Sequence, residues 1–482
     1  MGRAKTLATL GPASGTQELI EKMIKAGLDA VRINMSHGNY DDHAERIKNA
    51  RAAAKKLNRP LAVLVDLSGP KIRTGLLQNA KPVILETGAD FILTSREIEG
   101  SSHEVSTNFK EIPKLVQKGN KILLDDGAIE LRVKKVTKED VITEVINGGI
   151  LSERKGINLP NTKLPIPSLT KKDHADLEWA MKQDVDYIAL SFVRQGKDCK
   201  EVRDIIKKLN TRKWGRPLLV AKIEKAEAIE NLDEIIKETD GVMVARGDLG
   251  VETSAELVPV YQKQIIETAV THDKFVITAT QMLQSMIESP RPTRAEASDV
   301  ANAVWDGTDA VMLSAETASG KYPIEAVATM ERIVTTAETV KTTKLKRPIK
   351  FSEEPTGRTS QAICKAAAIC AREMLTDKIA VFTESGLMAR RLSSVRSGLS
   401  TFALTNAVEV YNQLSLIWGV EPLLHEIAST TDAMLKDGEK TLLEAGVVEN
   451  GETIVMMAGR LSGLGLSSSV VVWTIGEDVP KR

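Results

Sequence analysis

Polar and charged residues stand at the ends of several short apolar runs along this chain. Runs of this length are typical of buried strands, and charged side chains beside them cost free energy unless they are paired. The residues concerned are Arg32 and Asn34, Asp66, Lys222 and Glu224, Arg246, Gly247 and Asp248, Thr280, and Ser314 and Glu316. They could form salt bridges that close the rim of a sheet. Because a stabilising device has no reason to be confined to one end of the strands, we favour a shared polar site.

Glu224 and Asp248 follow consecutive runs and would suit a hard divalent cation beside a phosphate. Mg²⁺ typically takes one or two carboxylates and leaves its other positions to water and substrate oxygens, and Mn²⁺ is an alternative with the same ligands. Lys222 and Glu224 alternate along one run, so both side chains can point the same way. Lys222 and Arg32 add cationic charge, and Thr280 adds a hydroxyl. This set fits phosphoryl transfer by charge stabilisation and also chemistry through an enolate.

Composition and missing motifs exclude several functional classes. Lys+Arg and Asp+Glu both number 65 in 482 residues, so the overall charge favours neither a nucleic acid nor a membrane as a partner. The sequence has no Walker A loop, kinase glycine loop or HExxH motif. Three cysteines without a CxxC pair indicate reduced thiols. Without a signal peptide or a run of about 18 apolar residues, we expect a cytoplasmic protein.

The apolar runs alternate with amphipathic helical stretches, which is the pattern of a parallel sheet. Eight β/α units favour a closed (β/α)8 TIM barrel of the α/β class, although an open doubly wound sheet has the same local pattern. In such barrels the active site forms at the carboxyl ends of the strands, where the polar residues fall. The eight runs are Thr6–Leu10, Ala30–Ile33, Leu61–Leu67, Tyr187–Ser191, Leu218–Ile223, Val242–Ala245, Val276–Thr280 and Ala310–Leu313.

Two further domains are expected beside the barrel, which would comprise residues 1–69 and 171–340. Residues 70–170 contain short β-like segments separated by Gly, Asn and Asp turns, so we expect an inserted small all-β domain that acts as a lid. Residues 341–482 begin with a polar linker and return to an α/β pattern, as in a regulatory domain. Its predicted elements are helices Gln361–Leu375 and Leu387–Val395, strands Ile379–Phe382 and Thr401–Leu404, and two β-like runs near the end, Thr453–Met457 and Val470–Ile475.

Six motifs in these segments are similar to those of the pyruvate kinase family, in the family's order and spacing over essentially the whole chain. The resemblance implies Mg²⁺-dependent transfer of the phosphoryl group of phosphoenolpyruvate to ADP, giving pyruvate and ATP in the last step of glycolysis. It also implies a homotetramer. The motifs are RINMSHG from Arg32, DLSGPKIRTG from Asp66, AKIE from Ala221, ARGDLG from Ala245, TATQML from Thr278, and the segment Pro290–Val300.

The resemblance also implies roles in holding the substrate and the metal. Arg32 would bind the phosphoryl group of phosphoenolpyruvate, and Lys222 would neutralise that group during transfer. The divalent ion would be bound by Glu224 and Asp248. The substrate carboxylate would be held by Thr280 and by the backbone amides of Gly247 and Asp248.

Nucleotide binding and proton transfer are implied in the same way. Arg73 and Lys172 match positions that contact ADP or ATP, and Asn34 and Ser36 lie alongside them. The enolate left after transfer is protonated, and its ketonisation makes the reaction strongly favourable. The positions that resemble the family's proton relay are Thr280, Ser314 and Glu316.

The chain departs from the family pattern at a potassium site. Many members carry Glu at the position of Lys71 and a liganding Thr at that of Leu67, whereas Asn34, Ser36 and Asp66 keep ligand positions. Leucine removes an oxygen ligand, and lysine places a permanent ammonium near the cation site. Lys71 could also be an ordinary solvated lysine. We prefer the first interpretation and expect activity without K⁺.

A regulatory ligand could bind the last domain. Thr383, Glu384, Ser385 and Gly386 follow a strand and open a helix, as in a phosphate-binding turn, although a plain β–α turn has the same pattern. Glu384 stands where relatives that respond to fructose-1,6-bisphosphate can carry Lys, which disfavours a bisphosphate. Arg460, in a later glycine-rich loop, could hold a monophosphate such as AMP or a sugar phosphate.

Two other functions share some of these features. A barrel lyase or aldolase that uses Mg²⁺ and a pyruvate enolate needs the same acids and arginine, but it needs neither ADP nor a lid. A metabolite sensor built on an inactive enzyme predicts the loss of a catalytic group. Lys222, Glu224 and Asp248 are all present, so both functions are less favoured.

Overall fold

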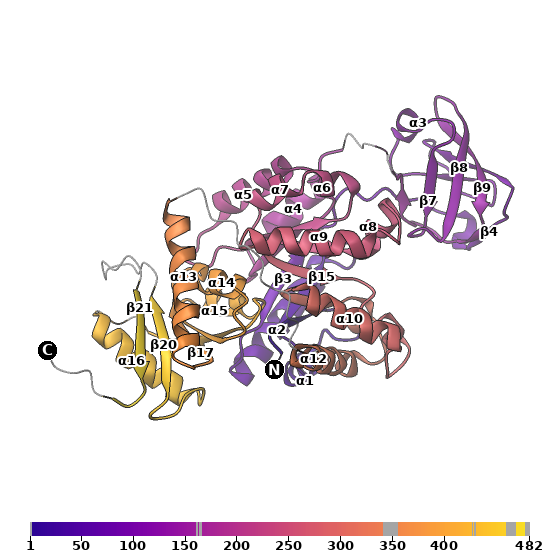
Figure 1. Ribbon diagram of the computed structural model, residues 1–482. Helices are drawn as coiled ribbons and strands as arrows, with labels where there is room; N and C mark the ends of the chain where they lie inside the picture. Colours follow the sequence, from indigo (N-terminus) through magenta and orange to yellow (C-terminus); the bar gives the residue numbers. More distant parts are fainter. Residues whose placement is uncertain are drawn as a thin grey trace.

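The computed structural model describes residues 2–160, 162, 166–340, 355–426, 428, 430–458 and 469–477. Eight parallel strands close into a barrel in the order β1-β16-β15-β14-β13-β12-β3-β2, which confirms the predicted fold class (Figure 1). Each predicted run is one of these strands. Their bounds are β1 Lys5–Thr9, β2 Ala30–Asn34, β3 Ala62–Asp66, β12 Tyr187–Leu190, β13 Leu218–Ile223, β14 Gly241–Ala245, β15 Phe275–Ala279 and β16 Ala310–Leu313.

Helices surround the barrel and bury one apolar face each against it. In α1, for example, Ile20, Met23 and Ile24 are buried at the spacing of one helix face. Several helices begin at a side-chain cap: Thr170 and Thr293 form capping boxes with the third residue of the helix that each precedes. The helices are α1 Gln17–Lys25, α2 Tyr40–Leu57, α4 Lys171–Ala180, α5 Gly196–Leu209, α6 Ala226–Glu230, α7 Leu232–Glu238, α8 Arg246–Glu252, α9 Val258–Thr271, α10 Arg294–Asp306, α11 Ala315–Ala318 and α12 Pro323–Thr339, with the 3₁₀ turn η2 Gln284–Ile287.

The segment between β3 and α4 is the inserted β-domain, which we call the lid. Its six-stranded sheet has the order β11-β7-β8-β9-β5-β6, and a separate pair joins β10 to β4. The lid has its own core around Phe91, Leu93 and Ile122, and it projects from one end of the barrel (Figure 1). The domain limits at 69/70 and 170/171 stay predictions. Its elements are η1 Gln78–Ala80, β4 Val83–Leu85, β5 Asp90–Thr94, β6 Glu104–Ser106, α3 Ile112–Leu115, β7 Lys121–Leu124, β8 Ile129–Val136, β9 Asp140–Asn147, β10 Gly149–Leu151 and β11 Ile157–Asn158.

The C-terminal domain is a five-stranded sheet in the order β19-β18-β17-β20-β21, in which only β21 is antiparallel to its neighbour. The predicted helices and strands are present, whereas β19, α15 and α16 were not predicted. The linker was predicted for residues 341–358, of which residues 341–354 lie outside the described residues. For residues 355–358 the prediction was wrong, because they form the first turn of α13. The elements are α13 Pro355–Glu373, β17 Lys378–Phe382, α14 Leu387–Ser394, β18 Ser400–Thr405, α15 Val408–Leu414, β19 Val420–Leu424, α16 Thr431–Glu444, β20 Thr453–Ala458 and β21 Ser469–Thr474.

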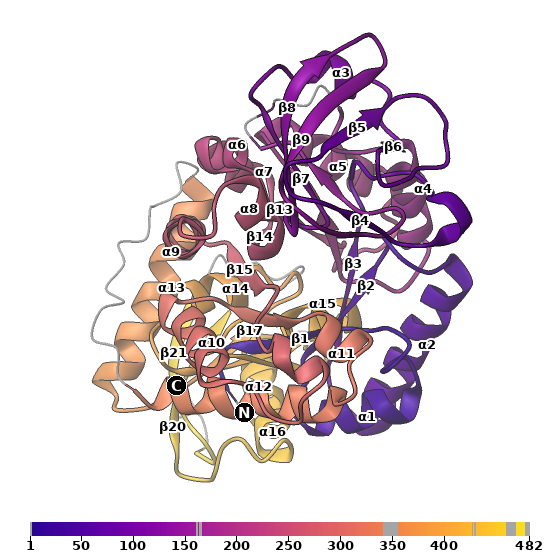
Figure 2. The same ribbon diagram turned by 90° about the vertical axis from the view of Figure 1, so that its right-hand side faces the viewer.

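The C-terminal domain closes the end of the barrel opposite the lid (Figure 1). The side chains inside the barrel, such as Leu7 and Leu64, belong to one hydrophobic cluster with Leu414 and Ile417 of the C-terminal domain. The Tyr187 hydroxyl donates to the Gln413 carbonyl at 2.5 Å, and the Gln413 amide donates to the Arg216 carbonyl at 2.8 Å. The other end of the barrel is therefore the one left open for a site, and Figure 2 shows the lid above it.

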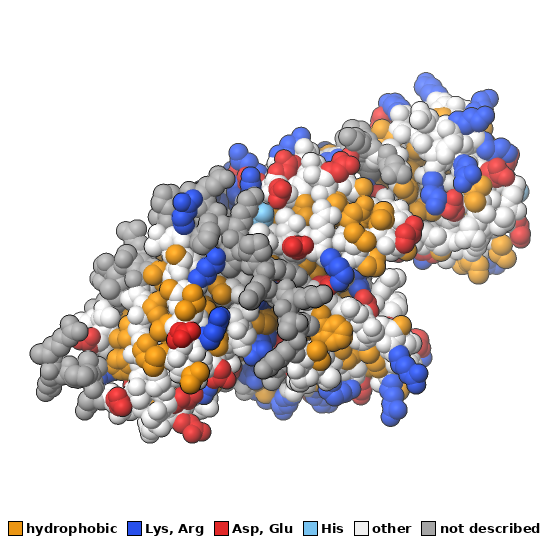
Figure 3. Space-filling model, in the orientation of Figure 1, with side chains coloured by type: hydrophobic (Ala, Val, Ile, Leu, Met, Phe, Trp, Pro, Cys, Tyr) orange, Lys and Arg blue, Asp and Glu red, His pale blue; other side chains and the backbone are white. Residues whose placement is uncertain are grey.

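Charge is mixed over the surface. On the face drawn in Figure 3, acidic and basic side chains are interspersed over the barrel and the lid, in keeping with their equal numbers in the sequence. None of the helices in the described part of the chain has the length and apolar character needed to cross a membrane.

Candidate active site

The parallel barrel gathers the predicted site residues at one end. Asn34 and Asp66 are the last residues of β2 and β3 and are register partners. Glu224 directly follows β13, and Asp248 lies in the first turn of α8, which directly follows β14. The carboxyl ends of neighbouring strands thus bring together residues that are far apart in the sequence.

Asp66 is shared by two cations. Its Oδ2 lies 2.6 Å from Arg32 Nη2 and 2.7 Å from Arg32 Nε, and its Oδ1 lies 3.3 Å from Lys222 Nζ. Arg32 also donates to the Thr9 hydroxyl at 3.1 Å. Burial alone would raise the pKa of Asp66, but the charges of Lys222 and Arg32 hold it below its ordinary value. Asp66 is therefore ionised and fixes both cations.

Lys222 stays charged although it is buried. Its Nζ lies 2.8 Å from Glu224 Oε1 and donates to Ser191 Oγ at 2.8 Å. Burial acts against the ammonium, but the negative charges of Asp66 and Glu224 raise the pKa of Lys222 well above its ordinary value. A permanent ammonium is therefore held at the end of the barrel, with only 11% of its side chain exposed.

Glu224 and Asp248 fit a divalent cation. Glu224 is fully buried; its Oε2 accepts a hydrogen bond from the Phe192 amide at 2.7 Å, and its Oε1 faces the Lys222 ammonium at 2.8 Å. Burial and then the charge of Asp248 raise the pKa of Glu224, against the opposing charge of Lys222. A cation bound between the two acids would offset both the cost of burying the Glu224 charge and the repulsion between Glu224 and Asp248. Among the described residues no group of three or more His, Cys, Asp or Glu could hold a metal. A site built on Glu224 and Asp248 would offer two carboxylates, a number that Mg²⁺ typically takes.

Thr280 is held in a strained conformation beside Gly247. Its φ of +70° is rare for a β-branched residue. The Gly247 amide donates to Thr280 Oγ1 at 2.8 Å, and Arg246 Nη2 donates to the Thr280 carbonyl at 2.7 Å while Arg246 pairs with Asp299. Arg246 thus supports the backbone around the site, and the Thr280 hydroxyl lies next to the amides expected to hold a carboxylate.

Ser314 and Glu316 lie at the end of β16 with different surroundings. Glu316 is fully buried, and its two oxygens accept from the backbone amides of Leu283 at 3.1 Å and Ser314 at 2.7 Å. The Ser314 hydroxyl is buried and has no hydrogen-bond partner in the structure. Ser314 is therefore better placed than Glu316 to exchange a proton with a bound molecule.

A cleft of about 720 Å³ separates the lid from the barrel rim. Lys71 lies at its lid side, with Nζ 3.4 Å from Asp126 Oδ1 and 3.6 Å from Asp248 Oδ1. Lys71 is thus an ammonium beside a predicted metal ligand rather than a fully solvated side chain. The residues that line the cleft include Lys71, Lys121 and Asp126 from the lid and Asp248, Thr280 and Ser314 from the barrel.

The predicted nucleotide and potassium residues are only partly brought together. Lys172 Nζ donates to the Met35 carbonyl at 2.9 Å and pairs with Asp176 at 2.5 Å, which places it beside the loop after β2. Arg73 lies at the base of the lid, where its Nη1 donates to the Arg154 carbonyl at 3.0 Å. Within the described chain, neither Arg73 nor Lys172 lines the cleft.

At the predicted potassium site, Asn34 accepts a hydrogen bond from the Ser36 amide at 3.1 Å, and Leu67, which replaces a ligand of the family, is fully buried. In the described part of the chain, the ion pairs of Lys71 are with Asp126 and Asp248 and not with Asp66. The ammonium of Lys71 therefore lies on the side of the predicted divalent cation.

The predicted effector turn lies at the start of α14. The Gly386 amide donates to Thr383 Oγ1 at 3.0 Å, and Gly386 has a φ of +72°. Glu384 is buried and Ser385 is exposed. Arg460 lies outside the described residues, so the predicted effector site stays a prediction.

Sequence reasoning missed two features of the site. Ser191 directly follows β12 and donates to the Leu67 carbonyl at 2.7 Å while accepting from Lys222. Its position at the end of an apolar run was the same signal that identified the other strand-end residues. A cluster of Asn158, Lys225 and Glu252 beneath the lid was also missed, because its members lie in three separate segments.

Comparisons with known proteins agree over the whole chain. The family model "Pyruvate kinase, barrel domain" matches residues 1–327, and "Pyruvate kinase, alpha/beta domain" matches residues 361–472. A pyruvate kinase of Staphylococcus epidermidis is 40% identical over 488 residues, which cover 100% of this chain and 82% of that relative. A Staphylococcus aureus pyruvate kinase is 40% identical, covering 99% of this chain and 81% of that relative. The crystal structure of a pyruvate kinase from Cryptosporidium parvum has a TM-score of 0.89 and 34% identity, covering 98% of this chain and 96% of the other.

Proposed function

The chain belongs to the pyruvate kinase family, and from this membership we propose how its residues carry out the reaction. It is a phosphotransferase that converts phosphoenolpyruvate and ADP into pyruvate and ATP. Members of the family use a divalent metal, and we assign Mg²⁺, with Mn²⁺ as the alternative. The observation that supports the assignment of residues is the buried, permanently charged Lys222 between Asp66 and Glu224 at the open end of the barrel.

Arg32 and Lys222 bind the phosphoryl group. The planar guanidinium of Arg32 suits two phosphoryl oxygens at once, and the ammonium of Lys222 supplies a point charge as the group moves. Asp66 holds both cations in place, so little reorganisation is needed when the substrate enters. The substrate carboxylate is held by the amides of Gly247 and Asp248 and by the Thr280 hydroxyl.

Glu224 and Asp248 hold the divalent cation. A divalent cation held there would supply positive charge against the negative charge that develops on the substrate as the phosphoryl group leaves. Lys222 stabilises the same charge from the barrel interior. After transfer the enolate takes a proton, for which the Ser314 and Thr280 hydroxyls are the proposed relay groups, while Glu316 fixes the backbone of Ser314.

Arg73 and Lys172 contact the nucleotide, and Lys71 replaces a potassium ion. Lys71 places its ammonium 3.6 Å from Asp248, where a monovalent cation would also offset negative charge. The proposal therefore includes activity without K⁺.

The proposal also includes the homotetramer typical of the family, which analytical ultracentrifugation would measure. It includes an AMP or sugar-monophosphate effector, whose binding isothermal calorimetry would measure.

The test is pyruvate formation from phosphoenolpyruvate at fixed Mg²⁺ and ionic strength, with and without ADP, in potassium and in a tetraalkylammonium salt. We expect ADP-dependent pyruvate in both salts. Activity in potassium alone would keep the kinase and remove the role of Lys71. Pyruvate formation that does not depend on ADP would favour a lyase, and the absence of pyruvate in both salts, even with effectors, would favour a metabolite sensor.

A further inference from the structure

The lid is joined to the barrel by a two-stranded ribbon. The chain leaves the barrel after β3 and returns through β11, and the two passing segments pair with each other. The Ile157 amide donates to the Ile72 carbonyl at 2.8 Å, and the Thr74 amide donates to the Lys155 carbonyl at 2.8 Å. Arg73 forms a bridge with Gly156 between these two bonds. The position of Arg73 above the barrel therefore depends on where this hinge ribbon, residues 72–74 and 155–157, is attached.

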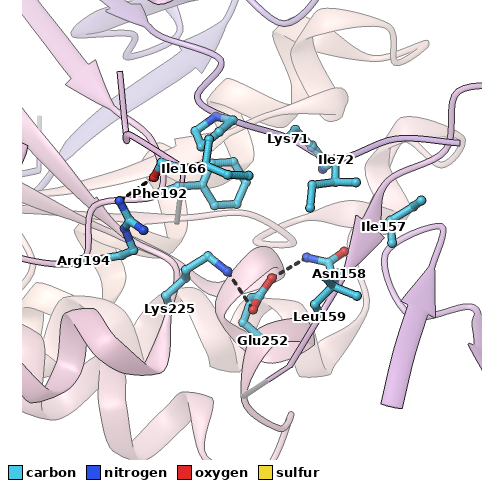
Figure 4. Close-up of a pocket in the computed structure, with 11 residues that line it drawn as sticks. Lys71, Ile72, Ile157, Asn158, Leu159, Ile166, Phe192, Arg194, Lys225 and Glu252 are labelled. Carbon is cyan, nitrogen blue, oxygen red and sulfur yellow. Dashed lines mark hydrogen bonds and ion pairs between the residues drawn. The ribbon is translucent and has the colours of Figure 1, made fainter. Parts of the chain in front are cut away.

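Three polar residues attach the ribbon to the barrel. Asn158 follows the ribbon directly and donates from Nδ2 to Glu252 Oε1 at 2.8 Å, and Lys225 Nζ lies 3.0 Å from Glu252 Oε2 (Figure 4). Asn158, Lys225 and Glu252 are only 4%, 7% and 6% exposed. We call these three residues the hinge cluster.

Apolar side chains shield the hinge cluster from solvent. The Lys225 ammonium lies 5.8 Å from the centre of the Phe192 ring, and Ile72, Ile157 and Leu159 line the same pocket (Figure 4). The pocket holds about 20 Å³, which is room for about one water molecule. The bond from Asn158 is therefore largely shielded from solvent, and breaking it would leave the buried Glu252 carboxylate with one hydrogen-bond partner fewer.

The hinge cluster also connects the elements that carry the metal ligands. Lys225 is the residue after Glu224, and Glu252 is the last residue of α8, whose first turn carries Asp248. From this geometry we propose that Asn158, Glu252 and Lys225 are positioning residues that set the lid, and with it Arg73, over the phosphoryl-binding residues. The inference rests on the proposed contact between Arg73 and the nucleotide.

A role in positioning the lid predicts an effect on one substrate. Arg73 moves with the ribbon, whereas Arg32 and Lys222 belong to the barrel. Replacing Asn158 by Leu removes the link to the ribbon but leaves the Lys225–Glu252 pair in the barrel. We expect the KM for ADP to rise about tenfold, as the loss of a hydrogen bond to a charged group allows, while the KM for phosphoenolpyruvate changes less than about twofold.

The experiment compares Asn158→Leu with the control Asn210→Leu. The control also loses a side-chain amide bond, 2.9 Å from Asn210 to the Arg212 carbonyl, but this bond lies in the loop between α5 and β13, away from the lid. Steady-state kinetics give both KM values, and hydrogen exchange follows the amides of Thr74 and Ile157. We expect faster exchange at these two amides in Asn158→Leu alone. Equal changes in both KM values, or unchanged exchange, would overturn the inference. If the leucine variant does not fold, Asn158→Ser makes the same test with a side chain too short to reach Glu252.

Arg73→Met, measured in parallel, separates this inference from the proposed function. If it leaves the KM for ADP unchanged, the nucleotide role of Arg73 is wrong, and the exchange at Thr74 and Ile157 still decides whether the hinge cluster holds the ribbon. If it raises the KM for ADP and Asn158→Leu does not, the nucleotide role stands and the hinge cluster does not position the lid.

Discussion

At the scale of single residues, the site depends on Asp66, the carboxylate that Arg32 and Lys222 share. Its pKa is lowered in the folded protein, so the stability from these pairs is present above its unfolded pKa of about 3.9 and is lost only as the pH falls through the lower folded value. At any pH near neutrality both cations remain fixed. A loss of activity between pH 5 and 6 would therefore have to come from other groups.

The charge of residue 71 should decide the need for a monovalent cation. In Lys71→Glu a third carboxylate would face Asp126 and Asp248, and repulsion at 3–4 Å costs from about 1 kcal/mol in water to about 4 kcal/mol near a protein surface. We expect K⁺ to activate this variant about tenfold or more at constant ionic strength. The control is Lys114→Glu in the exposed Lys114–Glu111 pair of the lid, which should show no such activation. Equal responses of the two variants to K⁺ would contradict the role given to Lys71.

At the scale of elements, an aspartate recurs at the closed end of the barrel. Each of four alternate strands, β2, β12, β14 and β16, directly follows an aspartate whose Oδ2 accepts from the second residue of the preceding strand. The bonds run from Thr6 to Asp29 at 2.8 Å, from Val63 to Asp186 at 2.7 Å, from Leu219 to Asp240 at 2.9 Å and from Val276 to Asp309 at 2.9 Å. These aspartates fix the register of the strand pairs from below, while the site occupies the opposite end.

Asp29 and Asp240 should respond to pH with opposite signs. Burial raises the pKa of Asp29 to about 6, so its ionised form costs stability as the pH rises from its unfolded value of about 3.9 through about 6. Asp29→Asn should therefore stabilise the protein at pH 7.5 by up to about 3 kcal/mol and by little near pH 4. This value is an upper limit, because Asp29 also lines a cleft of about 520 Å³ between the barrel and the C-terminal domain. Solvent in the cleft lowers the cost of the Asp29 charge.

Asp240→Asn is the matched control. Burial alone would raise the pKa of Asp240, but the charge of Arg216 holds this pKa below its ordinary value. Because the ionised form of Asp240 is thus stabilised in the folded protein, Asp240→Asn should destabilise the protein at pH 7.5. Urea unfolding of both variants between pH 4.5 and 7.5 measures the difference. Destabilisation by Asp29→Asn at pH 7.5 would contradict the stated cost of its charge.

The elements that could be predicted from the sequence are those with a strong local signal. The barrel strands are continuous apolar runs because they are buried on both faces. The C-terminal strand β19 was missed because Pro422 argues against a central strand, and the structure places it at the edge of the sheet, where proline is tolerated. The short helix α15 has only seven residues, too few to give a clear periodic pattern.

For the candidate site, strand ends were enough to predict that Arg32, Lys222 and Glu224 lie close together, because the fold itself places them at one end of the barrel. The link between Asn158 and Glu252 joins residues 94 positions apart in two domains, and no local pattern marks it. The four aspartates below the strands left a readable signal, an Asp directly before an apolar run, whose meaning depends on knowing that consecutive barrel strands are neighbours in a closed parallel barrel.

At the scale of the whole molecule, the barrel and the C-terminal domain share one hydrophobic cluster, whereas the lid has a separate core. Leu414, at the end of α15, is fully buried among side chains from inside the barrel. We therefore expect the barrel and the C-terminal domain to unfold as one unit and the lid to unfold separately. The five tryptophans, Trp179, Trp214, Trp305, Trp418 and Trp473, all lie outside the lid, so their fluorescence reports on the shared unit alone.

Leu414→Ala and Leu93→Ala make the matched comparison, because both leucines are fully buried, one in the shared cluster and one in the lid core. Leu414→Ala should lower the free energy of unfolding by about 2–5 kcal/mol and keep a single fluorescence transition in urea. Leu93→Ala should leave that transition in place while hydrogen exchange in the lid strands β7, β8 and β9 becomes faster. Two resolved fluorescence transitions in Leu414→Ala would mean that the C-terminal domain unfolds independently of the barrel. The contact between the C-terminal domain and the closed end of the barrel would then be an interface between two separately folding domains rather than part of a common core.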